Sequence, residues 1–286
     1  MTPLADAYSQ IVDQVLVADA AGLDLVGIQD HPYQRRFLDT FALIANMLAR
    51  TSRLTFFPDV ASLPFRPPPL LAKTAASLDL MSGGRFELGI GAGGFWDAVA
   101  GMGGPRRSTA EAADALEEAI PIIRAALDVG PERGVVRADG PHYPVPGYPA
   151  GPAPAHRVEI WVGAYRPRAL RLIGRLADGW VPSYGYFGPA AFKVASAKID
   201  DVAIAAGRDP ARIRRIYNIS GRITDGPSGD DPLVGPVERW VETLTEWAVE
   251  LGVDSFIFWP SDMETGQIER FATEVVPAVR AAAAAR

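Results

Sequence analysis

Apolar and polar positions follow two different periods along the chain, and segments of the two kinds alternate from start to end. In the longer segments, apolar residues recur every three to four positions and the pattern stops at or near a glycine, which is typical of amphipathic helices. Between them stand short, nearly continuous apolar runs, which are typical of strands buried on both faces. Helices are predicted at 6–21, 40–49, 67–78, 109–127, 167–178, 189–206, 236–251 and from about 266 into the tail, and strands at 23–28, 54–57, 86–90, 159–163, 180–183, 215–220 and 255–259.

This alternation predicts an α/β fold in which helices cover a parallel sheet. Seven strands are predicted, whereas a closed TIM (β/α)8-type barrel has eight. The chain opens directly in a helix, so we expect the first strand of the barrel to be missing from the N-terminus, through a late start or an incomplete barrel. Residues 1–286 are expected to form a single barrel domain.

Two stretches break the alternation. Residues 140–157 contain six prolines, and residues 224–236 are rich in glycine, proline and aspartate. Both are too long for tight connections, so they are expected to be insertion loops that act as mobile flaps over the ligand face. The alternative is that they are solvated linkers without a function.

The residue composition and net charge limit which classes of function are expected. The 286 residues are 48% hydrophobic and 22% charged, with a net charge of -6, which suits a globular enzyme and gives no reason to expect a nucleic-acid or anionic membrane partner. No apolar run is long enough to span a membrane. Cysteine is absent, which excludes disulfides and thiolate metal sites and fits a cytoplasmic protein.

A nearly side-chain-free turn follows the strand at 86–90. It contains Gly91, Gly93 and Gly94, and it stands at the carboxyl end of a parallel strand, where α/β proteins bind their ligands. A tight connection without a ligand is the alternative. Gly89, Gly91 and Gly94 also match a dinucleotide fingerprint, but the acidic strand end that this motif needs falls in a helix that opens with a capping box from Ser108 to Glu111.

His31 is the candidate for chemistry. It follows the strand at 23–28, and a histidine that titrates near neutral pH can exchange a proton beside a hydride transfer. Asp30 is expected to hold His31 or to cap a turn. The alternative role for His31 is a hydrogen bond that orders the loop. His142 and His156 lie in the proline-rich stretch and are expected to be exposed to solvent.

An ordered series of motifs resembles the luciferase-like monooxygenase family, whose members bind FMN or the deazaflavin coenzyme F420 in a (β/α) barrel. The series covers nearly the whole chain. It consists of GIQDHP at 27–32, LPFRPP at 63–68, AKTAASLD at 72–79 with SGGR at 82–85, WVGA at 161–164, RAL at 168–170, LADGW at 176–180 and AGRDP at 206–210.

The resemblance implies a cofactor site. A cis peptide bond would lie at Asp59-Val60 and support the middle ring of the flavin, although family members usually carry a small residue in place of Asp59. The cofactor phosphate would lie at Gly163, Ala164 and Tyr165, before a helix whose free N–H groups suit a phosphate. Ser183 and Tyr184 would add hydroxyl groups.

The resemblance also bears on the substrate. Deazaflavin members often carry a histidine at the position of His31, and some carry a glutamate where this chain has Gly94. An aromatic substrate pocket made of Tyr33, Trp96, Tyr186 and Trp259 is therefore expected, with core packing as the alternative for Trp259.

The sequence leaves open both which cofactor binds and which class of function the protein has. The favoured one is F420-dependent hydride transfer to or from a small organic substrate, on account of His31 and the arginine-rich composition. The alternatives are an FMN-dependent monooxygenase, a non-catalytic flavin-binding protein and a metal-dependent hydrolase using Asp30, His31 and Asp59, which lacks the histidines of such sites. No metal is expected, and family members are commonly homodimers.

Overall fold

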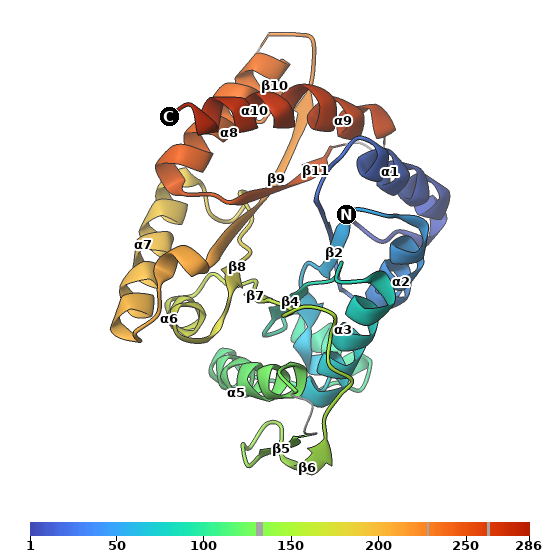
Figure 1. Cartoon of the computed structure of the whole chain (residues 1–286), viewed down its shortest axis with the longest axis vertical. Coiled ribbons are helices and arrows are strands. Elements are labelled where there is room, and N and C mark those ends of the chain that lie inside the picture. The colour runs from blue at the N-terminus through green and yellow to red at the C-terminus, as the bar shows by residue number, and fades with distance from the viewer. Residues whose placement is uncertain (130–133, 228, 262–263) are drawn as a thin grey trace.

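The computed structural model describes residues 1–129, 134–227, 229–261 and 264–286 (Figure 1). All seven predicted strands are present, and each pairs with its neighbours in parallel. They are β1 (Leu25–Ile28), β2 (Thr55–Pro58), β4 (Leu88–Gly91), β7 (Ile160–Val162), β8 (Gly179–Trp180), β9 (Arg214–Ile223) and β11 (Ser255–Pro260).

The predicted helices are also present and lie around the outside of the strands (Figure 1). They are α1 (Tyr8–Ala20), α2 (Thr40–Arg50), α3 (Pro68–Ser82), α5 (Thr109–Leu127), α6 (Pro167–Leu176), α7 (Pro189–Ala205) and α8 (Val237–Leu251). The last predicted helix consists of α9 (Thr265–Arg270), the π-helical stretch η4 (Phe271–Val275) and α10 (Val276–Ala284). In the described ranges, none of the helices is long and apolar enough to cross a membrane.

Local signals explain several helix boundaries. Asp39 caps α2, since its side chain accepts a hydrogen bond from the Ala42 N–H. The capping box predicted at Ser108 and Glu111 is confirmed at the start of α5. Gly83 ends α3 in the left-handed conformation that glycine adopts readily.

The strands follow one another around the molecule in chain order. β1 pairs with β2, a bridge between Phe56 and Phe86 connects β2 to the start of β4, and the order then continues through β7, β8 and β9 to β11. A short strand that the pattern did not predict, β3 (Ala61–Ser62), extends β2 and pairs with β4. All the carboxyl ends of the parallel strands therefore meet on one face.

β1 and β11 do not pair with each other within the described residues. Met1 lies beside β1, where its amino group donates to the Gly27 carbonyl at 2.6 Å and its carbonyl accepts from the Gln29 N–H at 3.0 Å. A cavity of about 590 Å³ lies between the two strands and is also lined by residues of α1 and α10. The seven-strand prediction is confirmed, and closure of the barrel is not seen in the part of the chain that is described.

Side chains fill the inside of the barrel below the face formed by the carboxyl ends. A buried cluster inside it contains Phe57, Trp161, Val181, Ile216 and Ile257, which come from or directly follow five different strands. A filled interior of this kind is expected of a TIM-type barrel and leaves the carboxyl face as the place for a ligand.

The proline-rich stretch is partly regular. Its middle contains β6 (Val145–Pro149), which forms an antiparallel hairpin with β5 (Val135–Ala138). The Glu118 carboxylate of α5 accepts hydrogen bonds from the N–H groups of His142 and Tyr143. The start of the stretch is therefore bonded to α5. Residues 224–236, of which 228 lies outside the described residues, end in β10 (Val234–Gly235) beside β9.

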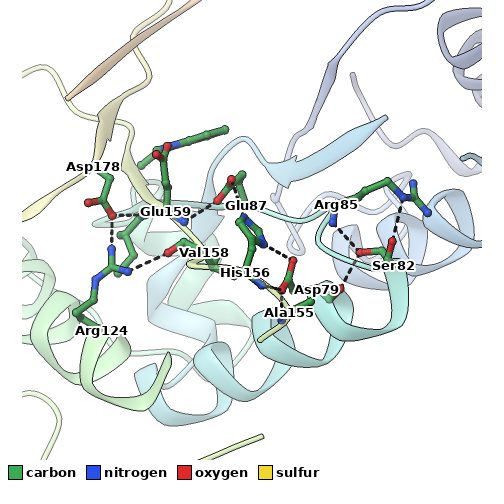
Figure 2. Close-up of polar contacts among 12 residues, drawn as sticks. Asp79, Ser82, Arg85, Glu87, Arg124, Ala155, His156, Val158, Glu159 and Asp178 are labelled. Carbon is green, nitrogen blue, oxygen red and sulfur yellow. Dashed lines mark hydrogen bonds and ion pairs between the residues drawn. The ribbon is translucent and has the colours of Figure 1, made fainter. Parts of the chain in front are cut away.

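His142 and His156 were predicted to be exposed to solvent, but both are only partly exposed, and two carboxylates hold the side chain of His156. Its Nδ1 lies 2.7 Å from Oδ1 of the buried Asp79 on α3, and its Nε2 lies 3.0 Å from Oε1 of Glu87 before β4 (Figure 2). The second Glu87 oxygen accepts from the Glu159 N–H, directly before β7. His156 thus joins the end of the proline-rich stretch to α3 and to the amino end of β4.

Candidate active site

The centre of the carboxyl face is formed by a cis peptide bond between Asp59 and Val60, directly after β2, as the resemblance implies. The Val60 side chain lies against three glycines of neighbouring strands. A Cβ atom placed on Gly91 or Gly163 would lie 2.8 or 2.9 Å from Val60 Cγ2, and one on Gly89 would lie 3.2 Å from Cγ1. Glycine is therefore needed at 91 and 163 because Val60 occupies the space.

The glycine turn after β4 lies beside the end of β7, since the Gly163 N–H donates to the Ile90 carbonyl at 3.0 Å. Gly93 has a φ of +97°, and a Cβ there would lie 2.5 Å from Cγ of Pro64. Around a Cβ on Gly94, by contrast, no atom of the described residues lies within 4 Å. At Gly91 and Gly93, protein atoms thus occupy the space that a side chain would need, whereas at Gly94 that space is open.

Asp59 connects the centre of the face to β9 and β11. Its Oδ1 accepts from Asn218 Nδ2 at 3.2 Å, and Asn218 Oδ1 accepts from Trp259 Nε1 at 2.8 Å. Asp59 Oδ2 is enclosed and has no hydrogen-bond partner within the described residues. Burial raises the pKa of Asp59 to about 6, although the terminal amino group and Asn218 act in the opposite direction.

His31 lies in a group of aromatic rings on the same face. Its Nδ1 is 2.6 Å from the Tyr33 hydroxyl oxygen. The ring centroid of His31 lies 5.5 Å from that of Tyr33, 6.5 Å from that of Phe37 and 6.0 Å from that of Phe95, which meets it edge-on. Phe65 packs against Tyr33 from the other side. The structure thus brings His31 and Tyr33 together, as two residues of one pocket.

Burial lowers the pKa of His31, although the Asp30 carboxylate acts in the opposite direction. Burial, together with the same carboxylate, raises the pKa of Tyr33 to about 12. His31 is therefore a neutral imidazole at neutral pH and Tyr33 a neutral phenol. Within the described residues, His31 Nε2 has no hydrogen-bond partner and is available to a ligand.

Asp30 does not hold His31. It is buried, and its carboxylate accepts from the Ser62 N–H and from Nε and Nη2 of Arg66, which also bonds Asp39. Asp30 therefore connects the end of β1 to β3. Among the described residues, no group of three or more His, Cys, Asp or Glu side chains is arranged to hold a metal ion.

A second polar group lies at the ends of β7 and β8. The Tyr165 hydroxyl lies 3.3 Å from Ser183 Oγ, and burial raises the pKa of Tyr165. The Ala164 carbonyl accepts from Trp180 Nε1 at 2.9 Å. The helix α6 begins next, with Pro167 in its first turn and no side-chain cap, so its first N–H groups remain available to an anion.

The remaining predicted residues are more dispersed. Trp96 begins the short helix α4 (Trp96–Gly101) and lies over Gly93. Tyr186 is exposed, with its ring 5.2 Å from that of Tyr165. Trp259 lines the cavity between β1 and β11 as well as bonding Asn218.

Sequence reasoning missed two residues of the site. Phe95 has a φ of 53°, which is uncommon for a bulky residue, and is 70% exposed while its ring contacts His31 and Tyr33. Its position directly after the glycine turn was the available signal. Asn218 is a buried amide in an otherwise apolar strand, and that contrast could have singled it out.

Three comparisons bear on this arrangement. A family model described as luciferase-like monooxygenase matches residues 1–227. An uncharacterised protein of Mycobacterium tuberculosis is 33% identical over 190 residues, which cover 66% of this chain and 62% of that protein. The phthiodiolone/phenolphthiodiolone dimycocerosates ketoreductase of the same species is 32% identical over 190 residues, again 66% of this chain but 46% of that protein. The matched region thus spans less than two thirds of these relatives.

Among solved structures, an F420-dependent secondary alcohol dehydrogenase in complex with an F420-acetone adduct superposes with a TM-score of 0.84. The alignment covers 98% of this chain and 97% of that chain, at 18% sequence identity. At this identity the similarity concerns the fold. It places the chain among (β/α) barrel structures.

Proposed function

Because the chain belongs to the luciferase-like monooxygenase family, an enzyme family of flavin- and F420-dependent oxidoreductases and monooxygenases, we propose that it is an F420-dependent oxidoreductase. The proposed reaction is hydride transfer between the deazaflavin and a small alcohol or carbonyl compound. One observation carries the proposal. The Val60 side chain forms an apolar surface beside Gly91 and Gly163, here called the Val60 platform, and His31 Nε2 is available on the same face.

The residues on the carboxyl face fit a flat tricyclic ring. Val60 fills the space that side chains at Gly91 and Gly163 would otherwise take, and so forms an apolar surface without neighbouring side chains at these two positions. Gly94 leaves open space next to this surface. Asp59 Oδ2, which is buried and without a partner in the described residues, lies beside Gly27 of β1. A heteroaromatic ring needs this combination of apolar support and few polar partners.

The phosphate of the cofactor would be held by Gly163, Ala164 and Tyr165 with Ser183. The uncapped start of α6 offers N–H donors and the positive end of a helix dipole. The Tyr165 and Ser183 hydroxyls stand at the adjacent strand ends and can add hydrogen bonds. These residues lie across the platform from His31, so that a long cofactor would span the face.

In the proposed reaction, the bound deazaflavin would supply or accept one hydride. Residues of the chain itself accept or donate the accompanying proton. His31, neutral at neutral pH, can accept the proton of a substrate hydroxyl at Nε2 or donate to a substrate oxygen from the same atom. The rings of Phe95 and Tyr33 pack against His31 and supply apolar walls beside it, and Trp96 and Tyr186 remain the proposed outer contacts of the substrate.

Two comparisons support alcohol or carbonyl chemistry with F420. A solved structure with the same fold is an F420-dependent secondary alcohol dehydrogenase, and a relative over 190 residues is a ketoreductase. His31 suits a reaction in which a proton accompanies the hydride. An FMN-dependent monooxygenase is the second candidate, because the family includes such enzymes.

The test is turnover with defined cofactors. The enzyme is mixed with oxidised F420 and a panel of small secondary alcohols, and loss of the absorbance of the oxidised cofactor is followed. Reduced FMN with oxygen is the parallel assay. Turnover with F420 supports the proposal, whereas oxygen-dependent turnover with FMN alone would replace it with the monooxygenase. Binding of either cofactor without turnover of any substrate would favour the non-catalytic alternative.

His31→Ala should leave cofactor affinity nearly unchanged and lower kcat by about 10²–10⁴-fold, the usual contribution of a general acid or base. The measurement is kcat together with cofactor affinity. If turnover survives in this variant, His31 only orders its loop.

The assembly and location of the protein are also proposals. We propose a homodimer, as is common in the family, and the cytoplasm as the compartment. Sedimentation at several protein concentrations would test the first.

A further inference from the structure

The contact between Tyr33 and His31 is the shortest polar contact in the aromatic pocket. The two atoms, Tyr33 Oη and His31 Nδ1, lie 2.6 Å apart. In the part of the chain that the structure describes, it is the single hydrogen bond of each of these two side chains. His31 and Tyr33 are both partly buried, so solvent reaches part of this pair.

A phenol is suited to this position because it can both donate and accept. When the imidazole proton is on Nε2, the Tyr33 hydroxyl donates to Nδ1, and when the proton is on Nδ1, the same oxygen accepts it. The contact therefore persists in both neutral tautomers and in the imidazolium. A carboxylate or a backbone carbonyl at this place would hold only the forms with a proton on Nδ1.

Among the described residues, Tyr33 is the group that can take a proton from His31 Nδ1. Phe37 and Phe95 cover other sides of the His31 ring and have no polar atoms. The charged groups nearby, Asp30 and Arg66, are bonded to each other, and Asp30 acts on His31 only through its charge. Nδ1 thus reaches no other proton acceptor in the described residues.

Resting on the proposed alcohol and carbonyl chemistry, we propose that Tyr33 is the proton relay of His31. In alcohol oxidation, the hydride of the substrate C–H bond passes to the oxidised deazaflavin, and the O–H proton passes to His31 Nε2 as the C=O bond forms. The proton on Nδ1 then passes to Tyr33 Oη, and the original Tyr33 proton passes to water. One hydride and one proton leave the substrate, and His31 and Tyr33 are both neutral again.

The matched variant is Tyr33→Phe, which keeps the ring contacts with Phe65 and Phe95 and removes only the hydroxyl. Tyr148→Phe is the control, because Tyr148 lies in the β5–β6 hairpin and its hydroxyl bonds no histidine. Both variants are expected to fold, and circular dichroism verifies this before the comparison.

The first readout needs neither cofactor nor substrate. The chain has three histidines, so ¹⁵N-labelled histidine gives a simple NMR spectrum in which a His31 variant assigns the His31 signals. In Tyr33→Phe the acid dissociation constant of His31 should rise about tenfold, because the imidazolium loses one charge-assisted hydrogen bond. Unchanged His31 signals would overturn the relay, and Tyr148→Phe should leave them unchanged.

The second readout uses the loaded enzyme with F420 and an alcohol that it oxidises. Tyr33→Phe should bind F420 as the unaltered enzyme does, keep KM within about twofold, lower kcat at least tenfold and increase the solvent isotope effect on kcat. If F420 binds and kcat and the isotope effect stay unchanged, the relay is wrong while the proposed function stands. If no cofactor binds, the proposed function is wrong, and the NMR result alone decides whether Tyr33 controls the protonation of His31.

Discussion

At the scale of single residues, the site depends on how Val60 is accommodated. The glycines after β4 and β7 predicted a ligand site, but sequence reasoning placed the ligand directly against their backbone. The structure shows Val60 between Gly91 and Gly163, so their missing side chains make room for protein atoms first. This could not be predicted from one chain, because Val60 is about 30 residues from Gly91 and about 100 from Gly163.

The difference between the glycines gives the first prediction. Gly91→Ala should lower the free energy of unfolding by about 1–3 kcal/mol, because its Cβ would overlap Val60. Gly94→Ala should leave stability within about 0.5 kcal/mol, since its Cβ enters open space, but should weaken cofactor binding. Urea unfolding and cofactor titration measure the two effects. Equal stability of the two variants would contradict the packing described for Val60.

Asp59 gives the second prediction. Its pKa is raised by burial from 3.8 to about 6, so the ionised carboxylate destabilises the fold by about 1–3 kcal/mol above pH 6, and this cost disappears as the pH falls below 4. Asp59→Asn should therefore be more stable than the unaltered protein at pH 7.5, with an advantage that shrinks toward pH 4. Urea unfolding at several pH values measures it. An advantage independent of pH would show that Asp59 is not the titrating group.

At the scale of elements, the hydrophobic period predicted seven of the parallel strands and every long helix, because each is buried on a definite face, but it missed the two-residue parallel strands β3 and β10. It also missed the β5–β6 hairpin, whose two strands are mostly exposed and include Pro146 and Pro149. Prolines argue against a strand unless it lies at an edge, and this two-stranded sheet has only edge strands. The polar contacts of His156 also join residues 69 and 77 positions apart.

The contact of His156 with α3 gives the third prediction. Burial alone would lower the pKa of His156, but the bonds to Glu87 and Asp79 outweigh it and raise the pKa above its usual range. Burial raises the pKa of Glu87 to about 7. The stabilising charge on His156 is therefore present below pH 6.5 and is lost as the pH rises through the raised pKa.

His156→Ala should thus destabilise the protein by about 1–3 kcal/mol at pH 6, since Asp79 loses a partner while buried, and by less at pH 9. His142→Ala is the matched control, because the His142 side chain makes no such contacts in the described ranges, and it should have little effect. Thermal unfolding at both pH values is the measurement. An equal loss for the two variants would mean that the carboxylates do not stabilise His156.

At the scale of the whole molecule, the order of the elements was enough to identify the architecture. Seven parallel strands with outer helices, and a series of motifs in family order, predicted the barrel before its contacts were known. The spatial neighbours at the carboxyl face were only partly predictable. His31 and Tyr33 are two residues apart and were both identified, whereas the Asp59–Asn218 pair joins β2 to β9 and needed the three-dimensional fold.

The proposed function requires that a single cofactor spans the carboxyl face of the barrel, from the His31 pocket to the start of α6. The most direct measurement is a titration of the purified protein with F420 and, separately, with FMN, followed by cofactor fluorescence. We predict saturable, one-to-one binding of F420 that Gly94→Ala weakens and His31→Ala leaves nearly unchanged. Saturable binding of neither cofactor would contradict it.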